Sequence, residues 1–361
     1  MQQTSVWKKL YKHKTAMLGL IIIAIAIFVA IFGYIISPDN SIDADLQTVE
    51  IQSKPLGYKQ QFLKIANNIT EQNSFSSFFF GKKNDYKYLP IKSYAINAEN
   101  IIVQKYIDDD TAMAITYNIN TITNNNPANI QNQIITKKYL LGTDAFGRDI
   151  LSRLIIGTRV SLMVGLIAVI ISLSIGIILG AFAGYYKGRV DAIIMWFINV
   201  TWSIPTLLLV FAITLTLGKG FWQIFIAVGL TLWVSVARLV RGQVMALKEM
   251  EYIQAARALG FKDMRIIFKH VLPNIIGPVL VIAAGNFATA IIVEAGLSFL
   301  GIGVQPPQPS WGLMIKENYN LIITNNAAQA LIPGFAIMLL VLAFNLLGSG
   351  LRDVVDVKSA S

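Results

Sequence analysis

Six long stretches without a charged side chain constrain this sequence more than any other feature. They cover residues 15–38, 160–186, 192–218, 220–237, 270–293 and 318–351. A hydrocarbon core of about 30 Å requires roughly 20 helical residues at about 1.5 Å each, and helices of about 17 residues still span it. Every stretch meets that requirement, including the shortest, which has 18 residues. The sequence therefore predicts an all-α membrane protein with six transmembrane helices.

The composition supports this fold class and excludes several kinds of chemistry. Only 14% of the 361 residues are charged, whereas soluble domains carry about 25%. The absence of cysteine excludes disulfides, thiol catalysis and cysteine–zinc sites. The two histidines, His13 and His270, are too far apart in the sequence to suggest a metal site. We identify no catalytic, cofactor-binding or metal-binding residue.

The positions of Lys and Arg predict the orientation, because short cytoplasmic segments are enriched in both. With both termini inside, fifteen of the thirty basic residues fall in short cytoplasmic segments, and residues 37–158 are extracytoplasmic. Arg148, Arg153 and Arg159 fit this rule poorly. The apolar run from Ala16 to Ile36 exceeds the roughly 7–15 residues of a secretory signal, so we expect a retained signal-anchor.

The segment between the first two predicted helices is the one large polar region. It carries ten Lys and ten acidic residues, and about 100 residues suffice for a small folded domain. Alternating apolar residues predict strands at 101–107 and 112–119, and a short helix is expected at 58–69. We therefore divide the chain into residues 1–36 (tail and first helix), 37–140 (extracytoplasmic α+β insertion), 141–351 (core with the five other predicted transmembrane helices) and 352–361 (cytoplasmic tail). We expect the insertion to pack on the outer membrane face.

Ionisable side chains are almost absent from the predicted spans. Glu294, toward the outer end of the fifth helix, is a candidate for the transport pathway. Its alternative is a structural carboxyl near the interface, hydrogen-bonded to neighbouring backbone. Ion-coupled transporters commonly use buried ionisable groups, so a transport cycle in this chain would need energy from a partner.

Small residues and prolines indicate how the helices pack. Gly176, Gly180 and Gly184 recur every four residues and give the second helix a smooth face for close packing. Pro205 in the third span, and Pro273 and Pro278 in the fifth, each remove a backbone donor and would kink or interrupt the helix.

The loop 238–269 between the fourth and fifth spans carries seven basic and three acidic residues. Within it, the pattern predicts a short helix over residues 249–259, which ends at Gly260. Ala255 and Ala256 leave the middle of this helix bare, so a partner can approach closely. The alternative is an interfacial helix lying on the lipid headgroups.

This loop resembles the EAA signature of ABC importer permeases. The resemblance rests on Gln254-Ala255-Ala256, Gly260 and the run His270-Val271-Leu272-Pro273, with Gln254 where the family usually has Glu. The resemblance implies that loop 249–273 forms the coupling helix that docks on a cytoplasmic ATPase. The residues that it assigns to this role are Glu251, Gln254, Ala255, Ala256, Arg257, Gly260, His270, Leu272 and Pro273.

Three further segments narrow the resemblance to the C-type permeases of dipeptide and oligopeptide importers (DppC/OppC-like). They are residues 141–149, 303–312 and 347–353. The resemblance implies a type I ABC importer permease with a MetI-like core. It also places Gln305, Pro306 and Trp311, together with Glu294, as candidates for the pathway or outer gate. Consecutive prolines are expected to stiffen the 306–311 loop as polyproline II, either at the external mouth or as a rigid connector.

The function that the resemblance implies is that of a non-enzymatic permease subunit. It would move di- or oligopeptides across the inner membrane by alternating access. Its implied partners are a second homologous permease, two ABC ATPase subunits that bind ATP and Mg, and an extracytoplasmic solute-binding protein. The alternatives are a self-sufficient ion-coupled secondary transporter, a permease for nickel complexes or another solute, and a non-transporting scaffold.

Overall fold

A computed structural model describes residues 10–66, 74–97, 99–123, 127–218, 220–323 and 326–359 of the chain. These residues form two compact units. The first unit, which we call the helical unit, comprises residues 1–27, 160–305 and 335–361. The second, which we call the sheet unit, comprises residues 28–159 and 306–334. Three helices have residues in both units and are named where each unit is described.

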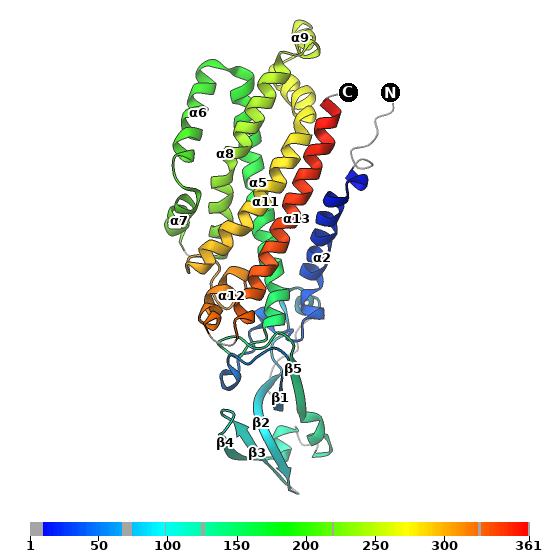
Figure 1. The fold of residues 1–361 in the computed structure, drawn as a ribbon, viewed down its shortest axis with the longest axis vertical. Coiled ribbons are helices and arrows are strands. Elements are labelled where there is room, and N and C mark those ends of the chain that lie inside the picture. The colour runs from blue at the N-terminus through cyan, green and yellow to red at the C-terminus, as the bar shows by residue number, and fades with distance from the viewer. Residues whose placement is uncertain are drawn as a thin grey trace. The chain divides into compact units, whose positions relative to one another are not determined.

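The helical unit is a bundle of apolar helices (Figure 1). It contains parts of the shared helices α2 (Lys14–Ile36), α5 (Ile150–Tyr186) and α13 (Ala328–Ser359), and all of α6 (Gly188–Trp202), α7 (Thr206–Leu217), α8 (Phe221–Lys248), α9 (Glu251–Ala258), α10 (Asp263–Ile266) and α11 (Ile276–Phe299). In the described part of the chain, five helices are long and apolar enough to cross a membrane, and the α6–α7 pair makes six if it counts as one span. The structure thus confirms a mostly helical membrane protein with five to six candidate spans.

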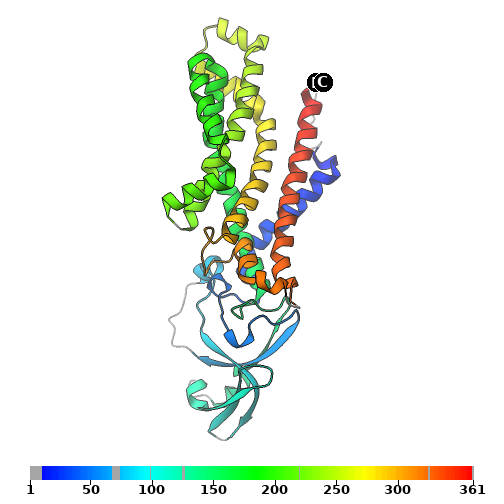
Figure 2. The same ribbon diagram turned by 60° about the vertical axis from the view of Figure 1, so that its left-hand side comes forward.

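The third predicted span is a broken helix and not a single straight one. Helices α6 and α7 meet at an angle of 94°, and the break contains Pro205 (Figure 2). Proline lacks the N–H that the helix needs and clashes with the preceding turn, so the first helix ends before it. In the fifth span, a π-helical turn (Ile267–Val271) and a 3-10 turn (Leu272–Ile275) around Pro273 separate α10 from α11, but Asp263–Phe299 is still one candidate span without a sharp bend. Pro278 is accommodated in the first turn of α11.

Three glycines of α5 lie directly against α8. A Cβ added to Gly180 would come within 2.5 Å of the carbonyl oxygen of Ala237, and Gly176 and Gly184 make similar contacts one turn away on either side. Such distances leave no room for a side chain, so the glycines set the spacing between the two helices.

Replacing Gly180 with Ala should therefore destabilise the bundle by about 1–3 kcal/mol, because the new methyl group meets backbone that cannot move aside. The matched control is Gly242→Ala in α8, where nothing lies within 4 Å of the added Cβ. We expect the control to be neutral or more stable by about 0.5–1 kcal/mol. Thermal unfolding of both purified variants in detergent measures the difference, and equal midpoints would contradict the packing role.

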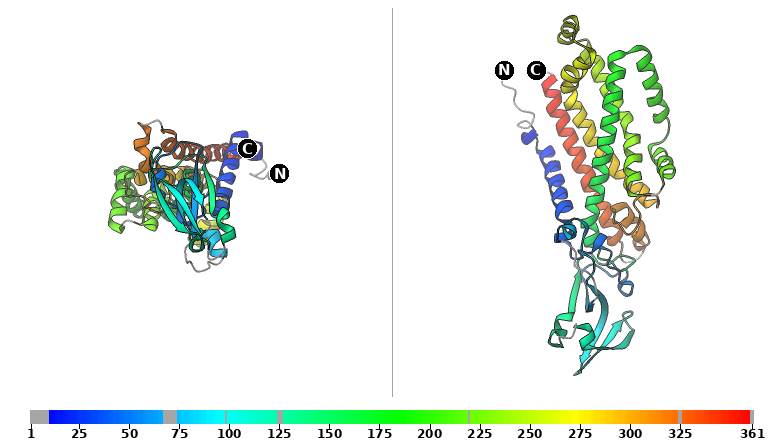
Figure 3. Two further views of the ribbon diagram at one scale, coloured as in Figure 1. Left: turned by 90° about the horizontal axis from the view of Figure 1, so that it is seen from below. Right: turned by 180° about the vertical axis from the view of Figure 1, so that it is seen from behind.

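The sheet unit contains one antiparallel sheet with the strand order β4-β3-β2-β1-β5 (Figure 3). The strands are β1 (Tyr58–Ala66), β2 (Tyr86–Ile96), β3 (Asn100–Tyr106), β4 (Ala112–Asn118) and β5 (Ile134–Tyr139). The short helices of this unit are α3 (Ser74–Phe80), α4 (Ile119–Ile122) and α12 (Trp311–Asn318), beside short 3-10 turns at Ile42–Ala44, Val49–Ile51, Pro127–Gln133 and Tyr319–Ile322. The α+β insertion after the first helix is confirmed, and both predicted strands are present as β3 and β4.

The helix predicted at 58–69 is wrong over the residues that the structure describes, 58–66, where the chain forms the strand β1. This strand pairs with β2 on one side and β5 on the other. Phe62 and Leu63 are neighbours in sequence and therefore face opposite sides of the sheet, yet both are fully buried. Burial on both faces removes the alternation that marks a strand, which explains the error.

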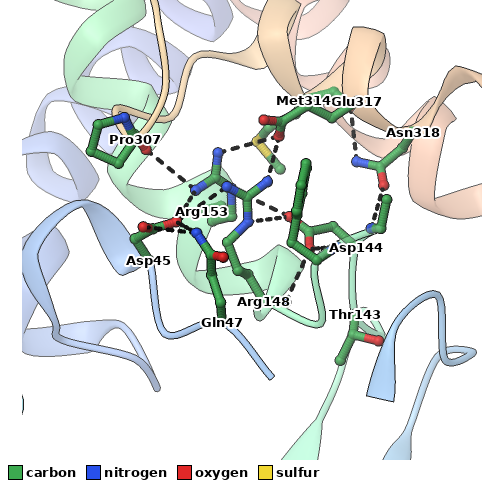
Figure 4. Close-up of polar contacts among 12 residues, drawn as sticks. Asp45, Gln47, Thr143, Asp144, Arg148, Arg153, Pro307, Met314, Glu317 and Asn318 are labelled. Carbon is green, nitrogen blue, oxygen red and sulfur yellow. Dashed lines mark hydrogen bonds and ion pairs between the residues drawn. The ribbon is translucent and has the colours of Figure 1, made fainter. Parts of the chain in front are cut away.

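A buried cluster of charged side chains joins three segments of the sheet unit. Figure 4 shows the guanidinium groups of Arg148 and Arg153 among three carboxylates, those of Asp45, Asp144 and Glu317. Arg148 binds Asp144 at 2.7 Å, Glu317 at 2.6 Å and Asp45 at 3.2 Å. Arg153 lies 3.4 Å from Glu317 and is fully buried.

This cluster explains why these arginines fit the charge rule poorly. Helix α5 has 37 residues, about 55 Å, so it is much longer than a membrane crossing requires, and Arg153 lies in its first turn. Burial alone would lower the pKa of Arg148, but the carboxylates of Asp144 and Glu317 raise it above its ordinary value. The two arginines are therefore internal ion-pair partners, and they report nothing about the sidedness of the membrane.

Candidate functional site

The short helix α9 is attached to the bundle by one apolar face. Ile253 and Ala256 are buried in a cluster with residues of α8 and α11 and of the segment between α9 and α11, including Val244, Ile266 and Val271. The helix begins at Glu251 and not at Glu249, because Glu249 still has helical angles and ends α8. Ala255 is exposed, as predicted. Ala256 is not exposed, because it packs inside the chain's own core.

Polar contacts hold the residues on either side of α9 near the end of α5. The Lys187 ammonium donates to Glu249 at 2.8 Å, and this bond lowers the pKa of Glu249 below its ordinary value. The Tyr185 hydroxyl donates to Asp263 at 2.7 Å. Lys248 donates to the carbonyl oxygen of Tyr185. These contacts attach the segments on either side of α9 to the end of α5.

Gly260 ends α9 as the sequence predicts. Its φ of +77° is the left-handed conformation that glycine adopts without strain. The N–H of Gly260 donates to Arg257 and that of Phe261 donates to Ala256, which satisfies carbonyl groups at the helix end. Glu251 in the first turn and Arg257 in the last complement the helix dipole.

The outer face of α9 presents an exposed surface of mixed character, which we call the α9 face. Gln254 and Ala255 are exposed on it, and Gln254 donates to the carbonyl oxygen of Glu249. Three large apolar side chains, Met250, Tyr252 and Leu259, are also exposed there, and Leu259 has 75% of its surface accessible. Exposed apolar side chains gathered around a small residue are typical of a protein interaction surface.

The segment after α9 places the other predicted residues beside it. The ring of His270 stacks on that of Phe261, and the Asn274 amide donates to the His270 carbonyl oxygen at 2.6 Å. Leu272 and Pro273 form the 3-10 turn before α11, and Leu272 packs against the same cluster as Ile253. The structure thus brings together all nine predicted residues of the loop.

The α9 helix lies at the same end of the helical unit as the start of α2 and the end of α13 (Figure 1). His13 and Asp353, from those two segments, are 2.9 Å apart. The described parts of four segments lie at this end of the unit and carry Lys or Arg: the turn between α5 and α6, the connection between α8 and α11, the start of α2 and the end of α13.

A groove with both polar and apolar lining residues, which we call the α8–α11–α13 groove, lies between these three helices. The residues that line it include Gln243, Asn286, Thr289, Asn345 and Arg352. The Asn286 amide is nearly buried and donates to the carbonyl oxygen of Leu232, and its oxygen lies 3.2 Å from the Ser235 hydroxyl. The groove's amides and hydroxyls carry no charge and do not interrupt the apolar stretches, so Asn286, Thr289 and Asn345 are not among the residues predicted from the sequence. Their signal in the sequence is an isolated Asn within an otherwise apolar span.

The predicted gate residues are divided between the two units, with Glu294 and Gln305 in the helical unit and Pro306 and Trp311 in the sheet unit. Glu294 is fully buried and accepts a hydrogen bond from Ser298 at 2.6 Å, while Gln305 donates to the carbonyl oxygen of Gly303. Pro306 lies in a turn, so the predicted polyproline II segment is wrong at this point. Trp311 is almost fully buried, and its indole N–H donates to the carbonyl oxygen of Leu154 at 3.0 Å. In this structure Trp311 packs inside the sheet unit.

Comparisons with known proteins place the chain among transport proteins. Residues 176–359 match the family described as "Binding-protein-dependent transport system inner membrane component", and residues 3–55 match "N-terminal TM domain of oligopeptide transport permease C".

Similar proteins include the glutathione transport system permease GsiD of Pectobacterium atrosepticum, 43% identical over 61% of this chain and 73% of its own length. The dipeptide transport system permease DppC of Bacillus subtilis is 40% identical over 64% of this chain and 75% of its own. The oligopeptide transport system permease OppC of the same species is 40% identical over 62% and 73%. A solved chain of the inward-facing MetNI methionine ABC transporter covers 56% of this chain and 95% of its own, with 20% identity and a TM-score of 0.47.

Proposed function

Because the chain belongs to the binding-protein-dependent inner-membrane transport permeases of the DppC/OppC family, we propose that it forms part of the pathway of an importer for short peptides, driven through α9. Family membership makes the chain a multi-pass permease subunit of an ABC importer. Beyond family membership, we propose a substrate class, the coupling residues, an orientation in the membrane and the composition of the complex.

The observation that carries the proposal is the α9 face. It combines an exposed Ala255, exposed apolar neighbours and firm attachment to α5 and α8. A helix built in this way can receive force from a docked ATPase and pass it to two spanning helices. The proposed complex contains two such ATPases, a second related permease and an extracytoplasmic solute-binding protein, with ATP and Mg bound only by the ATPases.

The orientation that we propose has α9 and both termini in the cytoplasm. The basic segments gathered at that end of the helical unit support it, because short cytoplasmic loops are enriched in Lys and Arg. An ATPase that uses cellular ATP requires the same placement.

A short peptide is the proposed substrate class. The relatives are named for dipeptide, oligopeptide and glutathione transport, and all three substrates carry amide bonds and free carboxylates. The α8–α11–α13 groove supports this class, since Gln243 and Asn345 offer amide groups to a peptide backbone and Arg352 offers a cation to a carboxylate. A pathway of this kind does not require a buried ionisable side chain.

Reconstitution into proteoliposomes tests the proposal. The chain is co-expressed with the permease, ATPase and binding-protein genes adjacent to its own, purified and supplied with ATP. We expect two ATPase subunits to co-purify, and we expect ATP-dependent uptake of at least one of a labelled dipeptide, a pentapeptide and glutathione. Uptake of nickel complexes alone would overturn the peptide assignment. Uptake driven by a proton gradient, by this chain without partners, would overturn the ATP-driven mechanism.

A further inference from the structure

Helix α3 is an unusually aromatic element of the sheet unit. Its seven residues, Ser74–Phe80, include four phenylalanines. Phe75 and Phe80 have 77% and 68% of their surfaces exposed, and Phe79 is also exposed. A soluble domain rarely exposes three such rings together, so this surface requires an apolar environment to cover it.

Contacts within the sheet unit place α3 against the last turn of α2. The ring of Phe78 lies 6.1 Å from that of Phe32, and Phe32 in turn lies 4.7 Å from Phe28. Rings of α3 continue this row, since Phe78 and Phe79 are 4.8 Å apart and Phe79 and Phe75 are 5.1 Å apart. The exposed rings of α3 are thus continuous with the aromatic surface of a spanning helix.

The depth of this contact corresponds to the edge of the bilayer. The apolar run of α2 from Ala16 to Ile36 is about 31 Å long, which matches a hydrocarbon core of about 30 Å. Phe32 lies four residues before the end of α2, or about 6 Å inside that edge. Helices that lie in the membrane interface bury their apolar face about 5–10 Å into the boundary between headgroups and acyl chains.

One hydrogen bond and one close packing contact hold α3 in this position. The Arg159 guanidinium donates to the carbonyl oxygen of Phe79 at 2.6 Å, near the end of the helix. Gly81, which follows directly, has a φ of +82° and packs against the Tyr34 ring, with no room for a Cβ. The next two residues, Lys82 and Lys83, are exposed at the level where phosphate groups of lipids would lie.

We propose that α3 is an interfacial anchor, whose phenylalanines enter the bilayer leaflet at the Ile36 end of α2. The occupant of this surface is lipid and not a protein partner, because the surface continues the exposed apolar side of α2, where Phe28, Ile31 and Ile35 are also accessible. The anchor attaches the insertion to the membrane at α3, in addition to the covalent connections of the insertion to α2 and α5. The inference holds for either orientation of the chain and does not depend on the transported substrate.

The absence of cysteine makes a direct test possible, since one introduced cysteine carries the only label. Phe75→Cys and Phe80→Cys are each spin-labelled in the full chain reconstituted into liposomes of phosphatidylethanolamine and phosphatidylglycerol. Met113→Cys in β4 is the matched control, because Met113 is a similarly exposed apolar residue (57%) in the same unit. The accessibility of each label to oxygen, which concentrates in lipid, is compared with its accessibility to a water-soluble nickel chelate.

We expect labels at 75 and 80 to be several-fold more accessible to oxygen than to nickel, and the label at 113 to show the reverse. If the labels at 75 and 80 are as accessible to nickel as the control, the helix lies in water and the proposal is overturned. If they are shielded from both reagents, and remain so in the complete transport complex, protein covers α3 and the lipid assignment is also overturned. Circular dichroism of each variant verifies that the label reports on folded protein.

Discussion

Ala255→Glu should prevent the permease from binding its ATPase partner while leaving the membrane domain folded. Ala255 is exposed on the α9 face, so the substitution places a carboxylate at the proposed contact without disturbing the chain's own core. An unpaired charge buried at an interface costs several kcal/mol, and each 1.4 kcal/mol is a factor of ten in affinity. We therefore expect at least a roughly tenfold loss of ATPase affinity and a comparable loss of ATP-dependent uptake at limiting ATPase.

Two neighbouring substitutions separate docking from folding. Ala255→Ser keeps the side chain small and uncharged, so uptake should be close to normal. Ala256→Glu places the same carboxylate among Ile253, Val244 and Val271, and it should reduce the yield of folded permease because Ala256 is only 7% exposed. Binding of the purified ATPase to detergent-solubilised permease measures the first effect, and size-exclusion chromatography measures the second. Equal ATPase binding by the Ala255→Glu and Ala255→Ser variants would contradict the docking role of this face.

Arg148→Ala should destabilise the sheet unit by about 3–5 kcal/mol. Arg148 lies within hydrogen-bonding distance of Asp45, Asp144 and Glu317, and its side chain is nearly fully buried. Removing one partner from a buried ion pair is costly because the remaining charges stay buried without compensation. Here three carboxylates would share only Arg153. This loss is a large fraction of the stability of a typical domain.

The control for this prediction is Lys59→Ala, which removes a basic residue from an exposed position of β1 in the same unit. Surface substitutions of this kind usually change stability by less than about 0.5 kcal/mol. Thermal unfolding in detergent, followed by a fluorophore attached to a cysteine introduced in the sheet, measures both variants. If Arg148→Ala unfolds at the same temperature as Lys59→Ala, the cluster does not stabilise the unit.

The spanning helices could be predicted from the sequence because the bilayer imposes a simple rule. Charged side chains are expensive in hydrocarbon, so the gaps between them locate the spans almost independently of tertiary structure. The break at Pro205 and the end of α9 at Gly260 could also be predicted from the sequence, because each depends on the backbone properties of one residue type. The α9 helix was also located, with an error of two residues at its start.

Features that depend on contacts distant in sequence were not predictable in this way. Strand β1 is buried on both faces by β2, β5 and their neighbours, so its pattern does not alternate. The partners of Arg148 lie 103 and 169 residues away, at Asp45 and Glu317. The burial of Ala256 likewise follows from the packing of α9 against α8, which no local pattern encodes. The amides of the α8–α11–α13 groove were not predicted because uncharged side chains do not interrupt an apolar stretch.

Site-specific cross-linking from Ala255→Cys tests the central claim, that α9 is the contact through which ATP hydrolysis reaches the membrane helices. The permease has no native cysteine, so a photoactivatable cross-linker attached at position 255 reports only on that site. Illumination of the assembled transporter should give one adduct between the permease and an ATPase subunit, and the same label at Met113→Cys should give none. The absence of an ATPase adduct from position 255, in a complex that still takes up substrate, would contradict the account.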